Sequence, residues 1–477
     1  MTAPYQAVGI DDARRMAHTA QRRRILSGSW DEDLRAYIGE YIDTQRQASW
    51  GRPVKSVNLM RSVVGQLSVL YDETPMLRHP ETEDLSALEG IFKLHQRHED
   101  YVLGFRESAI RVSWVPADDL GPAGVTVRLV TPDTLVIEAA DARPGEPATI
   151  YELRERVNPD SGKVEPFWDV WDIASPNGPS FKVIKPGATP KDYTGHFSPE
   201  MVGAYPFVDP DGRPFLPFVL YHARDTGQIW DAYAWDELPE ATLSLALYFT
   251  FFNHAVKDAS WVQKYGVNVQ LQGLTVAGEG DESRQRVSTD PASILLFRAV
   301  GGEAGSLGSF PLPVEPSKLI DAIRTYTAMI GETLGIGKWD AEQLGPQSGI
   351  ALTIKRDAVR EMTARTEPQF RRGDLELARK AALIHNLYAV GADRLPVDGY
   401  SITYTAIPKS REEMTTELDR DLKLIEAGLL SRVDMIQQMR PELSRAEAFA
   451  LLVQIQKESQ ALADLATTPP TTTENAP

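Results

Sequence analysis

The chain has 477 residues, of which 42% are hydrophobic and 25% are charged, a balance typical of a globular protein. Since a typical domain holds about 100–200 residues, this length predicts roughly two to four packed domains. The absence of cysteine excludes disulfides, thiolate metal sites and a cysteine nucleophile. The formal net charge of −17 argues against a protein that grips nucleic acid along its whole surface, because cations must replace the counterions of phosphate.

No stretch of the sequence predicts a signal peptide or a membrane span. The N-terminus is polar, and the arginines at positions 14, 15 and 22–24 precede no long apolar run. The most apolar stretch, residues 241–253, is shorter than the roughly 18 residues needed to cross a bilayer. We therefore expect a soluble protein.

The N-terminal half predicts helices followed by strands. Apolar residues recur at helical spacing over residues 58–71, and Pro75 ends this helix. A second helix is expected over residues 84–112, with polar and charged side chains on one face. Residues 206–217 contain four prolines and predict an irregular segment. Alternating polarity predicts strands at 125–130, 135–138, 149–156, 167–172 and 218–222.

Residues 237–261 differ in character, because apolar side chains cover nearly every face of the helix that they predict. Such a helix is buried, and here we expect it to lie between subunits. Short strands are expected at 267–271 and 294–298, in a region with glycine-rich stretches. A further helix is predicted over residues 316–334.

The longest predicted element is a helix over residues 350–390. At about 1.5 Å per residue it would be roughly 60 Å long. Pro368 lies inside it and predicts a kink, because proline removes a backbone donor and clashes with the preceding turn. The remaining elements are a strand at 401–407, helices at 412–426, near Val433 and at 445–465, and a mobile Thr/Pro-rich tail at 467–477.

One glycine-rich segment is faintly similar to a phosphate-binding loop. Residues 331–338 read GETLGIGK, but five residues separate Gly331 from the Gly-Lys pair where that loop has four. Trp339 also follows where Ser or Thr is required. The end of a helix is the favoured interpretation.

Two histidines raise the possibility of a metal site. His95 and His98 lie three residues apart on a predicted helix, beside Glu99 and Asp100. No third ligand is evident, so a solvated, charged helix face is favoured. Carboxylate pairs arise by chance among 67 acidic residues, and the motifs typical of serine hydrolases, zinc proteases and dinucleotide-binding folds are absent.

Basic residues flank the segment 338–349. Lys338, Lys355 and Arg356 can contact a phosphate backbone or can anchor a solvated loop, and the sequence favours neither interpretation. The arginines at positions 22–24 can contact phosphate, but they can equally lie on a solvated helix face or on a face that contacts another subunit.

The order of the predicted elements resembles that of tailed-bacteriophage portal proteins, the head-to-tail connectors of these viruses. In that family a stem helix leads to a small clip, a second stem helix returns, and a tunnel loop precedes a very long helix. Local similarities extend over most of residues 58–458. They are the helix of residues 58–75, VTPD and VIE within 130–138, residues 323–336, SGIAL at 348–352, and EAGLLS with RPE within 426–442.

The resemblance implies an α+β fold with a mixed α/β wing, two stem helices, a small strand-rich clip, a long kinked helix and a helical crown. It implies these boundaries: the N-terminal part of the wing at 1–236, stem helices at 237–261 and 316–335, the clip at 262–315, the tunnel loop at 336–349, the long helix with the rest of the wing at 350–407, the crown at 408–466 and a flexible tail at 467–477.

The resemblance also implies a function without catalysis, cofactor or metal. The chain would form a ring, usually of twelve copies, at one capsid vertex of the virion, after assembly in the host cytoplasm. Double-stranded DNA would pass through the ring during packaging and ejection, and the partners would be terminase, a head–tail adaptor, and the major capsid and scaffolding proteins, with no membrane. The residues implied to face the channel are Lys338, Trp339, Gln343, Gln347, Ser348, Lys355 and Arg356.

The acidic charge fits a channel that conducts DNA without holding it. One alternative is another ring-forming head–tail connector component, although such proteins are usually shorter and lack the long helix. A less favoured alternative is an uncharacterised enzyme, which a monomer with turnover would indicate.

Overall fold

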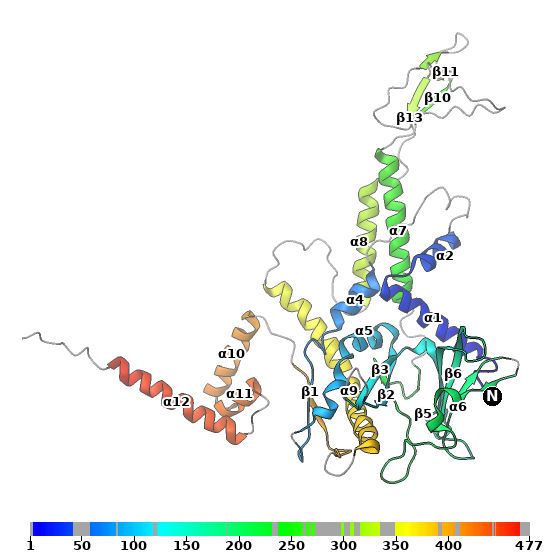
Figure 1. Cartoon of the computed structure of the whole chain (residues 1–477). Helices are drawn as coiled ribbons and strands as arrows, with labels where there is room; N and C mark the ends of the chain where they lie inside the picture. Colours follow the sequence, from blue (N-terminus) through cyan, green and yellow to red (C-terminus); the bar gives the residue numbers. More distant parts are fainter. Residues whose placement is uncertain are drawn as a thin grey trace, which may run out of the picture. The chain divides into compact units, whose positions relative to one another are not determined.

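The computed structural model describes residues 3–41, 58–82, 84–117, 122–187, 189–230, 237–260, 264–267, 269–271, 297–299, 306–309, 315–333, 349–389, 394–405, 411–440, 443 and 445–467. The chain is a mixed α+β protein, as the sequence predicts (Figure 1). Its contacts divide it into two compact units. Unit 1 comprises Met1–Pro346 and Lys355–Ile407, and unit 2 comprises Gln347–Ile354 and Pro408–Pro477.

In the described residues, unit 1 begins with the helices α1 (Ile10–Ser27), α2 (Asp31–Tyr41) and α4 (Leu59–Leu67). Asn58 fixes the start of α4, because its side chain accepts from the N–H of Arg61 at 2.9 Å and donates to the carbonyl of Ile25 at 2.6 Å. The predicted helix over 58–71 is thus present, but it ends at Leu67.

The single helix expected over residues 84–112 is wrong. The segment forms a 3₁₀ helix η1 (Ser86–Phe92), helix α5 (His95–Phe105) and strand β2 (Glu107–Val115). Arg106 separates the last two, with a left-handed φ of 76° that stops the helix. Residues 107–112 become a strand because both of their edges pair with other strands, a tertiary effect that overrides local periodicity.

Strand β2 is the centre of a three-stranded antiparallel sheet in the order β3-β2-β9. Its partners are β3 (Gly124–Val130) and β9 (Phe218–His222), which confirm the strands predicted at 125–130 and 218–222. The residues before β9 are irregular, as their prolines predict. A separate pair joins β1 (Met76–Arg78) to β14 (Ser401–Thr403), which covers the first part of the strand expected at 401–407.

A second antiparallel sheet has five strands in the order β4-β5-β6-β7-β8. Three of these strands confirm predictions, whereas β7 and β8 were not expected. The bounds are β4 (Leu135–Ala140), β5 (Arg143–Val157), β6 (Val164–Asp172), β7 (Ser180–Lys185) and β8 (Lys191–Asp192), with short helical turns η2 (Pro132–Thr134), α6 (Thr194–Phe197) and η3 (Pro199–Met201).

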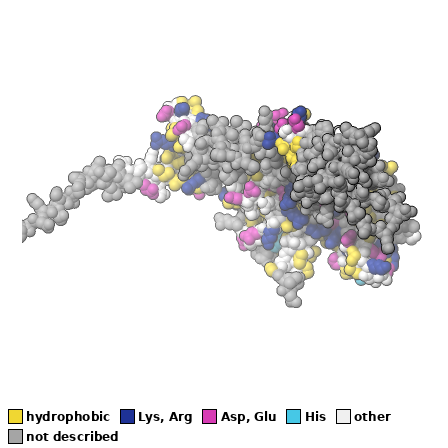
Figure 2. All heavy atoms as spheres, turned by 90° about the horizontal axis from the view of Figure 1, so that it is seen from above, with side chains coloured by type: hydrophobic (Ala, Val, Ile, Leu, Met, Phe, Trp, Pro, Cys, Tyr) yellow, Lys and Arg dark blue, Asp and Glu magenta, His cyan; other side chains and the backbone are white. Residues whose placement is uncertain are grey.

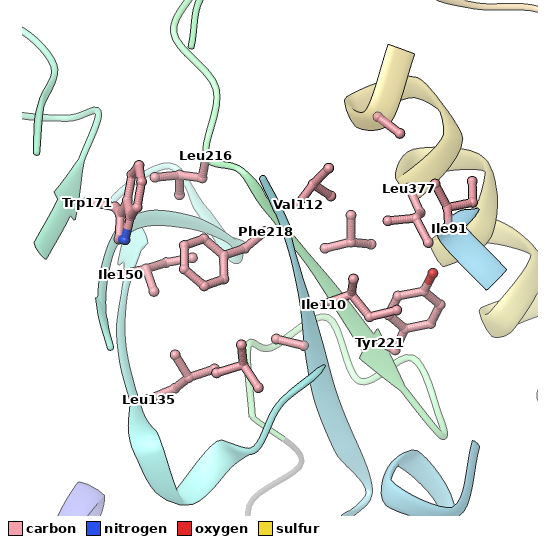
Figure 3. Close-up of a cluster of buried hydrophobic side chains, with 14 of the residues drawn as sticks. Ile91, Ile110, Val112, Leu135, Ile150, Trp171, Leu216, Phe218, Tyr221 and Leu377 are labelled. Carbon is pink, nitrogen blue, oxygen red and sulfur yellow. The ribbon is translucent and has the colours of Figure 1, made fainter. Parts of the chain in front are cut away.

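The two sheets and a long helix share one hydrophobic core (Figure 3). Ile150 and Trp171 come from the five-stranded sheet, Ile110 and Phe218 from the three-stranded sheet, and Leu377 from helix α9. Helix α9 (Gly349–Tyr388) has 40 residues and continues through Pro368, which confirms the long helical element. The kink at Pro368 stays a prediction.

A second core lies under two antiparallel helices that pack against each other, α7 (Glu237–Ser260) and α8 (Pro316–Thr333) (Figure 1). The N-terminal part of α7 packs on α1, α2 and α4. Among the few residues described between α7 and α8, the chain forms two antiparallel strand pairs. They join β10 (Lys264–Val267) to β13 (Ser306–Ser309), and β11 (Val269–Leu271) to β12 (Phe297–Ala299).

The described residues of unit 2 after Pro408 form the helices α10 (Arg411–Glu426), α11 (Arg432–Met439) and α12 (Arg445–Thr467), which confirm the predicted C-terminal helices. Ser431 starts α11 with a reciprocal capping box to Asp434. In the described parts of both units, no helix is long and apolar enough to cross a membrane. The tail predicted at 467–477 lies outside the described residues, except for the backbone of Thr467, which ends α12.

Candidate functional site

Most of the residues proposed to face DNA lie outside the described part of the chain. Lys355 and Arg356 lie within α9, but the description does not extend to their side chains. No contact among the proposed channel residues is therefore described. Those wholly outside the described residues are Lys338, Trp339, Gln343, Gln347 and Ser348.

The helical hairpin of α7 and α8, defined here as these two helices, is firmly held at its base. Residues 241–247 of α7 are buried. The hydroxyls of Tyr37 and Ser244 hydrogen-bond at 2.7 Å, and the N–H of Met60 donates to Thr242 Oγ1 at 3.0 Å. Apolar packing and these bonds join the start of α7 to the N-terminal helices.

Further along the hairpin, apolar side chains are left uncovered. Tyr248 is 40% exposed and Met329 is 60% exposed, while Phe251 and Phe252 are only half-buried. Tyr248 contacts Tyr326 edge-on, with ring centroids 5.5 Å apart, so the two helices hold each other in register. An apolar surface of this kind on a projecting element is typical of a contact with another protein chain.

The hairpin is also acidic. Over the side chains that the structure describes in α7 and α8, four carboxylates accompany two cations: Glu237, Glu240, Asp321 and Glu332 against Lys318 and Arg324.

On the described part of the surface shown in Figure 2, basic and acidic side chains lie interspersed. Mixed charge of this kind is typical of a solvated surface and not of one that grips DNA.

A buried carboxylate in α9 anchors this helix to the rest of unit 1. Asp374 is fully buried, and its Oδ2 accepts from the hydroxyls of Tyr71 at 2.7 Å and Tyr404 at 2.6 Å. Its Oδ1 accepts from the hydroxyl of Tyr221 at 2.8 Å, and His95 Nε2 lies 3.1 Å from the same oxygen. Four donors thus replace the water that a buried carboxylate loses.

Glycine at position 373 is required for this contact. A Cβ at Gly373 would overlap three carbons of the Tyr221 ring, closer than side chains tolerate. The bare backbone of α9 therefore lets Tyr221 approach and donate to the neighbouring Asp374.

Burial keeps the tyrosine donors of this anchor in their neutral forms. It raises the pKa values of Tyr71 and Tyr221 well above that of free tyrosine, and the charge of Asp374 adds to the effect. Burial also lowers the pKa of His98 well below its ordinary value, with a smaller contribution from His95. The His98 ring contacts Tyr221 edge-on at 4.3 Å and stays uncharged near neutral pH.

The expectation of a solvated histidine pair is wrong. His95 and His98 are buried, because the face of α5 that carries them packs on α9 and β9. Within the described ranges, no group of three or more His, Asp or Glu side chains is placed to hold a metal ion. Asp374 itself is closed to solvent and fully hydrogen-bonded, so we assign it to the fold and not to catalysis.

Sequence reasoning missed Asp374, although a signal existed. Phe370, Leu377 and Ala381 are buried at helical spacing on α9, and Asp374 lies on the same face. A carboxylate on the core face of a helix predicts buried partners.

No protein-family model matches this chain, and a search of curated proteins finds no match.

Proposed function

We propose that the chain is the ring subunit of a portal, the channel through which double-stranded DNA enters and leaves a phage capsid. One observation carries the proposal: a helical hairpin holds strand pairs between its two helices and is followed by a helix of 40 residues. In this proposal the two hairpin helices are the stem, the strand pairs are the clip, and α9 is the long helix, in the order that the family resemblance implies.

Ring formation is supported by the uncovered side chains of the hairpin. Tyr248 and Met329 would be covered if the hairpin of a second copy packed beside the first. A contact between two different faces of identical subunits closes into a ring when the rotation between the subunits permits it. We propose about twelve subunits on the basis of the family resemblance.

Charge supports the proposed movement of DNA. A ring repeats the net charge of −17 in every subunit, and an acidic wall disfavours adhesion of phosphate. In this proposal Lys338, Lys355 and Arg356 provide the few basic contacts near the constriction. The ring itself performs no catalysis, and a terminase supplies ATP hydrolysis from outside.

The anchor at Asp374 has a mechanical role in this proposal. It ties α9 to the segments of Tyr71, Tyr221 and Tyr404, so that force on the channel end of α9 passes into unit 1. Terminase and the head–tail adaptor would dock on the clip, while capsid and scaffolding proteins would surround the ring at the vertex.

A mass measurement on the purified chain tests the proposal. The subunit mass is 52.9 kDa, and light scattering should give a single species of about twelve subunits. A monomer at all protein concentrations would contradict the proposal, and turnover of a substrate by that monomer would favour an enzyme instead.

A further inference from the structure

Two like-charged cross-strand pairs face each other between the two sheets of unit 1. Arg111 of β2 is the direct partner of Arg128 on β3, and Glu152 of β5 is the direct partner of Asp169 on β6. Arg111 Nη1 donates to Glu152 Oε2 at 3.0 Å and lies 3.5 Å from Asp169 Oδ2, while Arg128 bonds Glu152 Oε1. Since like charges side by side destabilise a sheet, each pair depends on the opposite pair across the interface.

Two further arginines of β5 approach the same carboxylates. Arg156 Nη2 donates to both oxygens of Asp169, at 2.6 and 2.5 Å, and Arg154 Nη1 lies 3.4 Å from Oδ2. Glu152 and Asp169 are both buried. The arginine cluster, defined as Arg111, Arg128, Arg154 and Arg156, thus brings four guanidinium groups to two carboxylates and has an excess of two positive charges.

The cluster presents its excess charge outward. The side chains of Arg128 and Arg154 are 45% and 34% exposed, whereas Arg111 and Arg156 are largely buried. The inner pair is also fixed by aromatic rings, because Arg111 lies 4.8 Å from the Trp171 ring centroid. The buried Arg111 and Arg156, with the carboxylates of Glu152 and Asp169, therefore form a fixed base beneath the guanidinium groups of Arg128 and Arg154.

The four guanidinium groups of the cluster repel one another, and the two carboxylates balance only half of their charge. Burial lowers the pKa of Arg128, and repulsion from Arg154 and Arg111 acts in the same direction, although Glu152 opposes it. Burial likewise lowers the pKa of Arg156; Asp169 opposes this effect, and the same two arginines add a smaller repulsion. An added anion would relieve this repulsion.

We propose that the arginine cluster binds a phosphate group between Arg128 and Arg154. Guanidinium groups match the tetrahedral oxygens of phosphate with paired N–H donors, and a phosphate dianion would balance the two excess positive charges. The phosphate can belong to a free ion or to the backbone of DNA. The site does not depend on ring formation, so it can be tested whatever the oligomeric state.

Thermal unfolding of the full chain tests the site. Inorganic phosphate should raise the midpoint more than sodium chloride does at the same ionic strength. The double variant Arg128→Gln/Arg154→Gln should lose this extra shift, with an affinity for phosphate weaker by about tenfold or more. Arg143→Gln is the matched control, since Arg143 is also on β5 but is 69% exposed and pairs only locally with Glu146.

Foldedness of the variants is checked by circular dichroism. If the double variant does not fold, Arg154→Gln alone gives the test, because Arg156 still pairs with Asp169. A phosphate shift no larger than that of chloride, or an equal shift in the variants, would overturn the proposal.

A second arm identifies the source of the phosphate. Binding of a fluorescent DNA duplex is measured with and without competing inorganic phosphate. Weaker duplex binding in the Arg154→Gln variant, together with competition by phosphate, supports the site and assigns it to the DNA backbone. A phosphate shift with unaltered duplex binding supports the site and assigns it to the free ion.

Discussion

At the scale of single residues, Asp374 gathers hydrogen-bond donors that are far apart in the sequence. Tyr71, His95 and Tyr221 precede it by about 150 residues or more, and Tyr404 follows it. A slip of α9 by one residue would remove the carboxylate from all of these donors at once. The network therefore fixes the axial position of α9 in addition to stabilising it.

Replacing this charge should be costly. Asp374→Asn retains the size of the side chain but leaves the three phenols without a charged acceptor, and we expect a loss of about 3 kcal/mol in the free energy of unfolding. Urea unfolding followed by circular dichroism measures this loss. The control is Glu361→Gln on the same helix, at an exposed ion pair, which should change stability by less than about 0.5 kcal/mol. Equal losses in the two variants would refute the role of the anchor.

His98 should make the fold sensitive to acid. Because burial places its pKa in the folded chain below the ordinary value of 6.5, the unfolded chain takes up a proton first as the pH falls. Its contribution to stability is therefore complete above pH 6.5 and is lost progressively below it. Glu99 acts in the opposite sense, since burial raises its pKa to about 7 and the folded chain binds that proton more readily.

Comparison with His98→Leu separates these two effects. Below pH 6.5 the native chain should lose up to about 1.4 kcal/mol per pH unit relative to this variant, because the variant retains Glu99 and lacks only the buried imidazole. Unfolding free energies at a series of pH values measure the difference. Curves that run parallel for His98→Leu and the native chain would contradict the assignment.

At the scale of elements, local pattern predicted most helices and the strands with alternating polarity. It failed at residues 107–112, where the strand depends on pairing with β3 and β9 and not on its own sequence. It also failed for the surroundings of His95 and His98, since their helix carries charges but turns this face inward. Both errors concern partners distant in the chain, which a periodicity does not reveal.

The hairpin should be required for assembly but not for folding. Met329→Glu places a charge among its uncovered apolar side chains, so the proposed ring should dissociate while the circular dichroism spectrum remains unchanged. Light scattering measures the mass. Ile10→Glu is the matched control, because Ile10 is 82% exposed and is not part of the hairpin helices. An unchanged mass for Met329→Glu would exclude the hairpin as the contact.

Pro368 provides a further test at the same scale. Replacement by Ala restores an N–H donor to the interior of α9, so we expect a straighter helix, a folded subunit and an altered ring diameter. Ring diameters from electron micrographs measure the change. Normal rings with normal DNA packaging would show that the proline does not set ring geometry.

At the scale of the whole molecule, sequence order and charge support the function more than any single site does. The α+β class, the two hairpin helices and the strands β11 and β12 could be predicted from the sequence, whereas β10 and β13 were not expected. The pattern of α9 shows that Asp374 lies on its core face, but the partners of Asp374 and of the arginine cluster could not be predicted. Their side chains come from strands and helices that only the folded chain brings together.

The acidic balance, which excludes general adhesion to DNA, becomes consistent with a DNA-conducting ring once the chain is repeated around a channel. The most direct measurement is an end-on electron-microscope image of the purified chain. The proposal predicts closed rings with a central opening and about twelve subunits. Images that show only single subunits or open aggregates, at concentrations where the chain is folded, would contradict it.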